Sequence, residues 1–150
     1  MFRHHPILTV VTFVYLGVVG WITLGPQPFD EGSDSFVWWL LHLLGRFPLT
    51  DWVTYSLLEF WANVAMFVPV GLFFVLLLGR RRWWLAILLG VLLTVAIEFV
   101  QMFLPDRVSD PRDILANSVG ALVGVVIAVI VTWPAAVRRA RGRRLEARSA

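Results

Sequence analysis

The chain has 150 residues, of which 59% are apolar and only 15% charged, and its mean hydropathy is +0.77. These values exclude an ordinary soluble domain and predict an integral membrane protein with little chain left for anything else. The absence of cysteine excludes disulfides, a thiolate nucleophile and a Cys-ligated metal, and the three histidines are scattered at positions 4, 5 and 42. We therefore expect neither a metal nor a cofactor.

The first predicted membrane span covers about residues 7–24 and follows Pro6. Arg3 before an apolar run also resembles a signal peptide. The run is longer than a usual signal core and lacks a small-x-small cleavage site before Pro26, so we expect a retained helix. A different segment follows at about residues 36–47, with the sequence FVWWLLHLLGRF. It is too short to cross the bilayer, and we expect a short interfacial helix at the outer surface. The alternative is an extended loop whose Trp side chains anchor it.

Three further spans are predicted at about residues 55–78, 83–104 and 113–133, and we expect Pro134 to stop the last of them. Pro69 is expected to kink the second span. The predicted fold is therefore an all-α membrane protein, a bundle of four transmembrane helices with the interfacial helix added. Residues 1–137 would form a single transmembrane domain, and residues 138–150 a basic cytoplasmic tail.

The arginines predict how the chain is oriented in the membrane. All 13 basic residues are Arg: one lies near the N-terminus, three at positions 80–82 and six in the tail. With four spans, these ten lie on one side of the membrane, and only Arg46, Arg107 and Arg112 lie on the other. By the positive-inside rule, both termini should be cytoplasmic. The high pI is explained by this placement, so we expect no nucleic-acid partner.

Polar side chains inside spans are informative because each costs about 2–3 kcal/mol near the bilayer centre unless it is paired. In the third span, Thr94, Glu98 and Gln101 share one stripe at helical spacing. By helix rise, Glu98 should lie about 9 Å and Asn117 about 6 Å below the outer surface. We expect a polar ligand-binding layer in the outer half of the membrane, formed by Glu59, Asn63, Glu98, Gln101, Arg107, Asp110, Asp113 and Asn117.

Each of these residues also has a purely structural interpretation. Asp110 before Pro111 is typical of a helix N-cap, and the amides of the layer could simply bond neighbouring helices. The stripe of Ala116, Gly120 and Gly124 favours close helix packing, within the chain or in a homo-oligomer. Glu98 is the hardest to explain structurally, because a carboxyl group at that depth needs a partner. We expect it to form a charge cluster with the cation of Arg107 and with Asp113, and these three residues are the candidates for catalysis.

Three blocks in this region resemble the VanZ-like family of small bacterial membrane proteins. They are Asn63-x3-Phe67-x-Pro69-x-Gly71, then Glu98-x2-Gln101, then Arg107-x2-Asp110-x2-Asp113-x3-Asn117-x2-Gly120-x3-Gly124. The blocks cover residues 63–124, and the chain shows no departure at the named positions. The family is named for a component of glycopeptide-resistance clusters associated with teicoplanin resistance. The resemblance implies a bacterial plasma membrane and a link to the cell envelope or antibiotic response, and it implies no settled activity.

Three functions fit these observations. The favoured one is a non-enzymatic envelope protein whose outer polar layer binds a lipid-linked cell-wall precursor, a lipoglycopeptide or another amphiphile among the membrane lipids. A teicoplanin-type drug carries an acyl chain and acts on outward-facing wall precursors, which suits such a layer. The second is a membrane enzyme acting on a lipid-linked substrate, with Glu98 as acid or base and Arg107 stabilising an anion. The third is a proton-coupled carrier relying on Glu59 and Glu98.

Overall fold

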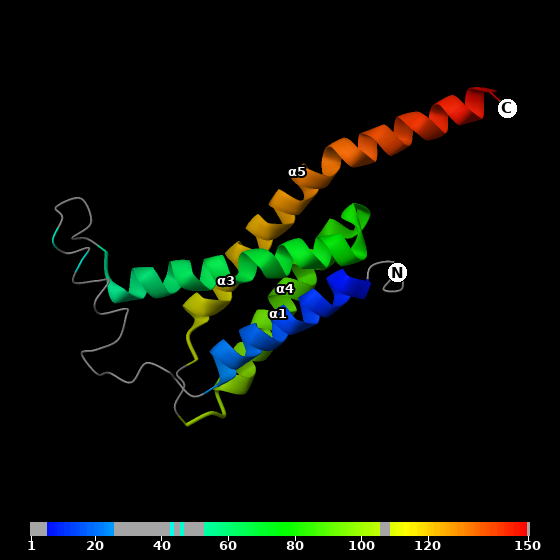
Figure 1. Ribbon diagram of the computed structural model, residues 1–150. Helices are drawn as coiled ribbons and strands as arrows, with labels where there is room; N and C mark the ends of the chain where they lie inside the picture. The colour runs from blue at the N-terminus through cyan, green and yellow to red at the C-terminus, as the bar shows by residue number, and fades with distance from the viewer. Residues whose placement is uncertain (1–5, 26–42, 44–45, 47–52, 106–108, 150) are drawn as a thin grey trace.

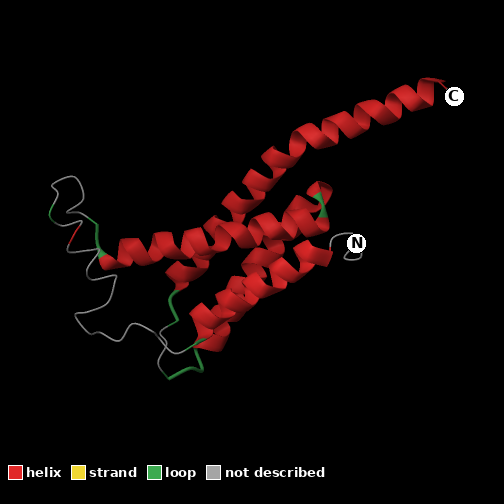
Figure 2. Ribbon diagram, viewed as in Figure 1, coloured by secondary structure: helices red, strands yellow, loops and turns green. Residues whose placement is uncertain are grey.

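The computed structural model describes residues 6–25, 43, 46, 53–105 and 109–149, and in that part of the chain every regular element is helical (Figures 1 and 2). Its helices are α1 (Pro6–Leu24), α3 (Tyr55–Leu78), the short 3-10 helix η2 (Arg80–Arg82), α4 (Trp83–Gln101) and α5 (Pro111–Ser149). Four of its helical segments are long and apolar enough to cross a membrane: 6–24, 55–78, 80–101 and 111–134. The predicted all-α fold with four spans is confirmed. The predicted interfacial helix at 36–47 lies outside the described residues, apart from Leu43 and Arg46.

Local signals explain both ends of α3 and the start of α5. The Thr54 hydroxyl accepts the backbone N–H of Leu57 (3.3 Å) and caps α3. Gly79 ends the helix with a φ of 83°, a left-handed conformation that glycine adopts without strain. At the start of α5, the carboxylate of Asp110 accepts the N–H of Arg112 (2.8 Å), and its carbonyl accepts that of Asp113 (2.9 Å). Asp110 therefore is the N-cap predicted from its position before Pro111.

Two predicted helix ends are wrong. α4 ends at Gln101, not near residue 104. Its last turn tightens through i to i+3 bonds from Phe103 to Val100 and from Leu104 to Gln101, because Pro105 disfavours a helical conformation of the residue before it. Pro134 does not stop α5, which continues to Ser149. A proline removes one helical hydrogen bond and can bend a helix without ending it, and Figure 1 shows α5 changing direction between its yellow and red parts.

Small residues bring α3 and α5 close together. A Cβ added at Gly120 would collide with the carbonyl oxygen of Val64, and one added at Gly124 would collide with that of Val68. Ala116 is also fully buried. The close packing predicted for this stripe is confirmed, and the neighbouring helix is α3 of the same chain. In this arrangement the two glycines are covered by α3, so the predicted homo-oligomer would have to use another surface.

The other two helices pack around this central pair. Apolar side chains of all four spans meet in one buried cluster, Val19, Phe67, Val70, Ile97 and Ala121. α1 is joined to α3 by a hydrogen bond from the Tyr15 hydroxyl to the carbonyl of Met66 (2.8 Å). The ends of α1 and α4 and the starts of α3 and α5 lie toward one end of the bundle, and the turn from α3 into α4 lies toward the other (Figure 1).

Candidate functional site

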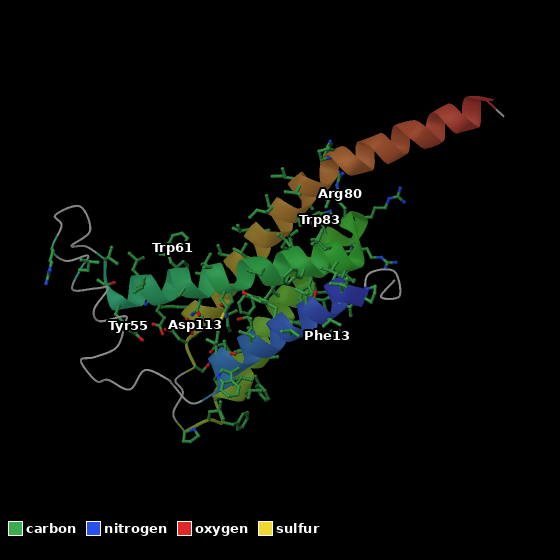
Figure 3. All side chains as sticks on the ribbon, in the orientation of Figure 1. Phe13, Tyr55, Trp61, Arg80, Trp83 and Asp113 are labelled. Atoms are coloured by element: carbon green, nitrogen blue, oxygen red, sulfur yellow. The ribbon has the colours of Figure 1, made fainter. Side chains whose placement is uncertain are left out.

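The predicted polar residues gather where α3 and α5 begin and α4 ends. Figure 3 shows Asp113 and Tyr55 toward this end, and Arg80 and Trp83 toward the opposite one. With α4 ending at Gln101, Glu98 is three residues from the end of its helix, or about 4.5 Å. Counted in the same way from Pro111, Asn117 is six residues inside α5, or about 9 Å. The depths of these residues below the membrane surface stay predictions.

Glu98 is bound to the connection between α4 and α5. Its carboxyl oxygen Oε2 accepts a hydrogen bond from the Ser109 hydroxyl (2.7 Å) and another from the backbone N–H of Asp110 (3.1 Å). Only 4% of Glu98 is exposed. Its predicted partner Arg107 lies outside the described residues, so the charge cluster of Glu98, Arg107 and Asp113 stays a prediction. Ser109 was not among the predicted residues, and its only signal in the sequence is its place immediately before the N-cap.

Asp113 and Asn63 connect α5 to α3. The Asn63 amide nitrogen donates to Asp113 Oδ1 at 2.8 Å. Asp113 is in the first turn of α5, where the helix dipole and the free backbone N–H groups stabilise a negative charge. Asn63 therefore forms a hydrogen bond between two helices, as expected, and its partner is a carboxyl group at the N-terminus of α5.

A small polar cleft lies beside this pair. Its lining is Ser56, Glu59, Phe60, Asp110, Arg112 and Asp113. Arg112 donates from Nη1 to the Ser56 hydroxyl (2.6 Å). The lining therefore combines one guanidinium group with three carboxyl groups. The cleft volume of about 10 Å³ is at the lower limit of what can hold a single water molecule. A larger ligand would therefore have to bind over the mouth of the cleft, where Glu59 and Arg112 are exposed.

Two buried amides lie apart from this cleft. Asn117 donates from Nδ2 to the Thr94 hydroxyl (2.9 Å), joining α5 to α4, and Gln101 donates from Nε2 to the carbonyl of Thr23 (2.9 Å), joining α4 to α1. These bonds confirm that the two amides connect helices. Asn117 Oδ1 and Gln101 Oε1 have no hydrogen-bond partner among the described residues. A buried acceptor left in this state costs about 1–3 kcal/mol, which a donor supplied by water or a ligand would offset.

The structure thus joins five of the eight predicted residues through hydrogen bonds or the lining of one cleft, and Gln101 and Asn117 bond to other residues. Asp110 joins the two parts of the site, since its N–H binds Glu98 and its side chain caps α5 beside the cleft. The cluster contains Glu59, Asn63, Glu98, Asp110 and Asp113, to which the structure adds Ser56, Ser109 and Arg112. No three His, Cys, Asp or Glu side chains are arranged to hold a metal ion within the part of the chain that the structure describes.

Comparison with known proteins adds one finding. A family model described as VanZ/LLP1 matches residues 12–132, which include all four spans in whole or in large part and every residue of the cluster. A search of curated proteins found no match, and a search of solved structures found none either.

Proposed function

Because this chain belongs to the VanZ/LLP1 family, we propose that it binds a lipid-linked or amphiphilic ligand in the bacterial cell envelope and so modulates susceptibility to teicoplanin-type glycopeptides. It would do so in the plasma membrane, with both termini in the cytoplasm and the polar cluster facing outward. The family match and the four spanning helices support a multi-pass membrane protein. The arginine asymmetry supports the orientation.

The observation that carries the proposal is the convergence of three helices on one polar cluster. Asn63 comes from α3, Glu98 from α4 and Asp113 from α5, and the hydrogen bonds through Ser109 and Asp110 hold them in place. Maintaining so many polar groups at the end of an apolar bundle costs free energy, which favours a functional role. A cluster fixed by its own hydrogen bonds can present charge to a ligand without rearranging.

The mouth of the cleft suits an amphiphile. Glu59 offers a negative charge and Arg112 a positive one, and both are exposed. Tyr55 and Trp61 on the same helix are also exposed, at 47% and 57%. A ligand with charged and hydrogen-bonding groups could meet Glu59 and Arg112 while its acyl chain stays in the lipid beside α3. Aromatic side chains at such a boundary favour ligands with one polar and one apolar part.

The geometry favours binding over the two alternatives. As an acid or base, Glu98 would have to reach a substrate, but its side chain is buried and one of its oxygens already accepts two hydrogen bonds. A proton-coupled carrier would need titratable groups that pass the proton from one side of the membrane to the other. The described carboxyl groups of the spans instead gather toward one end of the bundle.

A susceptibility assay tests the proposal. The protein would be expressed in a susceptible bacterial host. The minimum inhibitory concentration of teicoplanin for this strain would be compared with that for the same host carrying an empty vector. We expect expression to shift this concentration. Glu59→Gln and Arg112→Gln should each abolish the shift, because both side chains are exposed and their loss should leave the fold intact. Arg144→Gln in the tail is the matched control and should retain it.

Binding of teicoplanin to the purified protein in detergent provides the second measurement. The proposal requires both exposed variants to lose binding together with the shift in susceptibility. Retention of the shift by both variants would refute the role of the cleft. If instead Glu98→Gln abolished the shift while teicoplanin binding remained, the enzymatic alternative would be favoured.

A further inference from the structure

A second hollow lies at the opposite end of the bundle, between the turn from α3 into α4 and the distal part of α5. It is lined by Arg80, Arg81, Trp83, Val129 and Trp133 and has a volume of about 540 Å³. Figure 3 shows Arg80 and Trp83 close together at this end, away from Asp113. Among the described residues, the lining contains two arginines and no acid. It therefore presents net positive charge.

The arginines are placed there by the backbone. Gly79 turns the chain with its φ of 83°, and the three arginines that follow form the 3-10 helix η2. The Arg80 guanidinium lies over the Trp133 ring, 4.1 Å from its centroid, in a cation–π contact that connects η2 to α5. Arg81 is exposed beside it. One cation is thus held in position, and the second is accessible to an anion.

An apolar groove continues from this pocket. It has a volume of about 190 Å³, and it shares Trp83 and Val129 with the pocket. From there it runs between α4 and α5, past Ile87 on one side and Val126 and Ile130 on the other. Ile130 is 64% exposed, so the groove opens outward. A positive pocket at the helix ends and an apolar groove leading away from it match the two parts of a phospholipid.

We propose that this pocket and groove bind one anionic phospholipid, with its phosphate between Arg80 and Arg81 and an acyl chain along the groove. Arginine matches phosphate in charge and geometry, and clusters of basic residues at the membrane surface attract anionic lipids. Trp83 and Trp133 flank the headgroup at the level where tryptophan is enriched in membrane proteins. The positive-inside orientation assigns the lipid to the cytoplasmic leaflet. The site lies at the other end of the bundle from the polar cluster, and its ligand does not depend on the function proposed there.

Native mass spectrometry of the full-length protein in detergent tests this site. Phosphatidylglycerol and phosphatidylcholine with identical acyl chains would be titrated separately, so that the two lipids differ only in the headgroup. We expect the protein to prefer phosphatidylglycerol. The double variant R80Q/R81Q should lower its affinity for this lipid roughly 25-fold, taking about fivefold for each basic residue near a phosphate. Affinity for phosphatidylcholine should fall less, because its choline group offsets the charge of the phosphate that the two lipids share.

A control with the same change in charge separates a local site from general attraction. R141Q/R143Q removes two arginines from the tail and should retain the preference for phosphatidylglycerol. Arg81→Gln alone, which leaves the contact of Arg80 with Trp133 in place, should lower the affinity about fivefold. Val126→Trp should narrow the groove and lower the affinity of the protein for both lipids.

Three results would overturn the proposal. The first is an absence of headgroup preference in the unaltered protein. The second is an equal loss of preference in R141Q/R143Q and in R80Q/R81Q, which would mean that charge acts non-specifically. The third is displacement of the lipid by millimolar inorganic phosphate, which would identify an anion site that does not require the acyl chain.

Discussion

The hydrogen bonds of Glu98 give the most specific stability prediction. Ser109→Ala removes the hydroxyl that donates to Oε2 at 2.7 Å, the usual distance of an O–H···O bond. Hydrogen bonds between membrane helices average about 0.6 kcal/mol and reach about 1.7 kcal/mol. Because Glu98 is only 4% exposed, we expect a loss near the upper end, about 1.5 kcal/mol. Glu98→Ala also frees the N–H of Asp110 and should cost about 3 kcal/mol.

A double-mutant cycle measures the bond itself. Once Glu98 is alanine, Ser109→Ala has no bond left to remove. The loss of unfolding free energy in the double variant should therefore be about 1–1.5 kcal/mol smaller than the sum of the two single losses. The free energy of unfolding would be followed by tryptophan fluorescence during SDS titration of the protein in mild detergent. Thr132→Ala is the matched control, since the Thr132 hydroxyl bonds only within α5 toward the other end of the bundle. Its effect should add to that of Glu98→Ala. If the Glu98 and Ser109 variants also add, within about 0.5 kcal/mol, Glu98 does not hold the connection.

The same unfolding assay tests two more contacts, and labelling tests the orientation. Gly124→Ala should destabilise the protein by about 1–3 kcal/mol because the new Cβ meets the backbone of α3. Gly17→Ala is the control: its new Cβ would meet no neighbouring helix within 4 Å, so it should be neutral or stabilise the protein by up to about 1 kcal/mol. Equal effects would argue against the close packing. Asn63→Leu should cost about 1–2 kcal/mol because it leaves Asp113 without its donor, and the cost should fall below about 0.5 kcal/mol when Asp113 is already leucine. In this cysteine-free chain, Arg81→Cys should react with an impermeant maleimide only after cell lysis, and reaction in intact cells would reverse the proposed topology.

Each span could be predicted from the sequence because the tendency of a segment to enter the bilayer depends on its own length and composition. The second span was predicted at residues 55–78, the bounds of α3, and the others within a few residues of the apolar helical segments 6–24, 80–101 and 111–134. The capping role of Asp110 was also predictable, since it involves only neighbouring residues. Helical spacing likewise indicated the small-residue stripe of α5, although not which helix would pack on it.

The partners across the bundle were decided by the tertiary structure. Periodicity shows which face of a helix is polar, but the partner of a side chain depends on how far each helix is rotated and shifted along its axis. For this reason Ser109 could not be predicted as a donor to Glu98, since the two residues meet only where the start of α5 lies beside the end of α4. The predicted partner Arg107 lies outside the described residues. The proline at 134 illustrates the same limit. The missing backbone N–H of Pro134 can be read from the sequence. The continuation of α5 beyond it depends on the whole helix, whose preceding turns pack against α3 and α4.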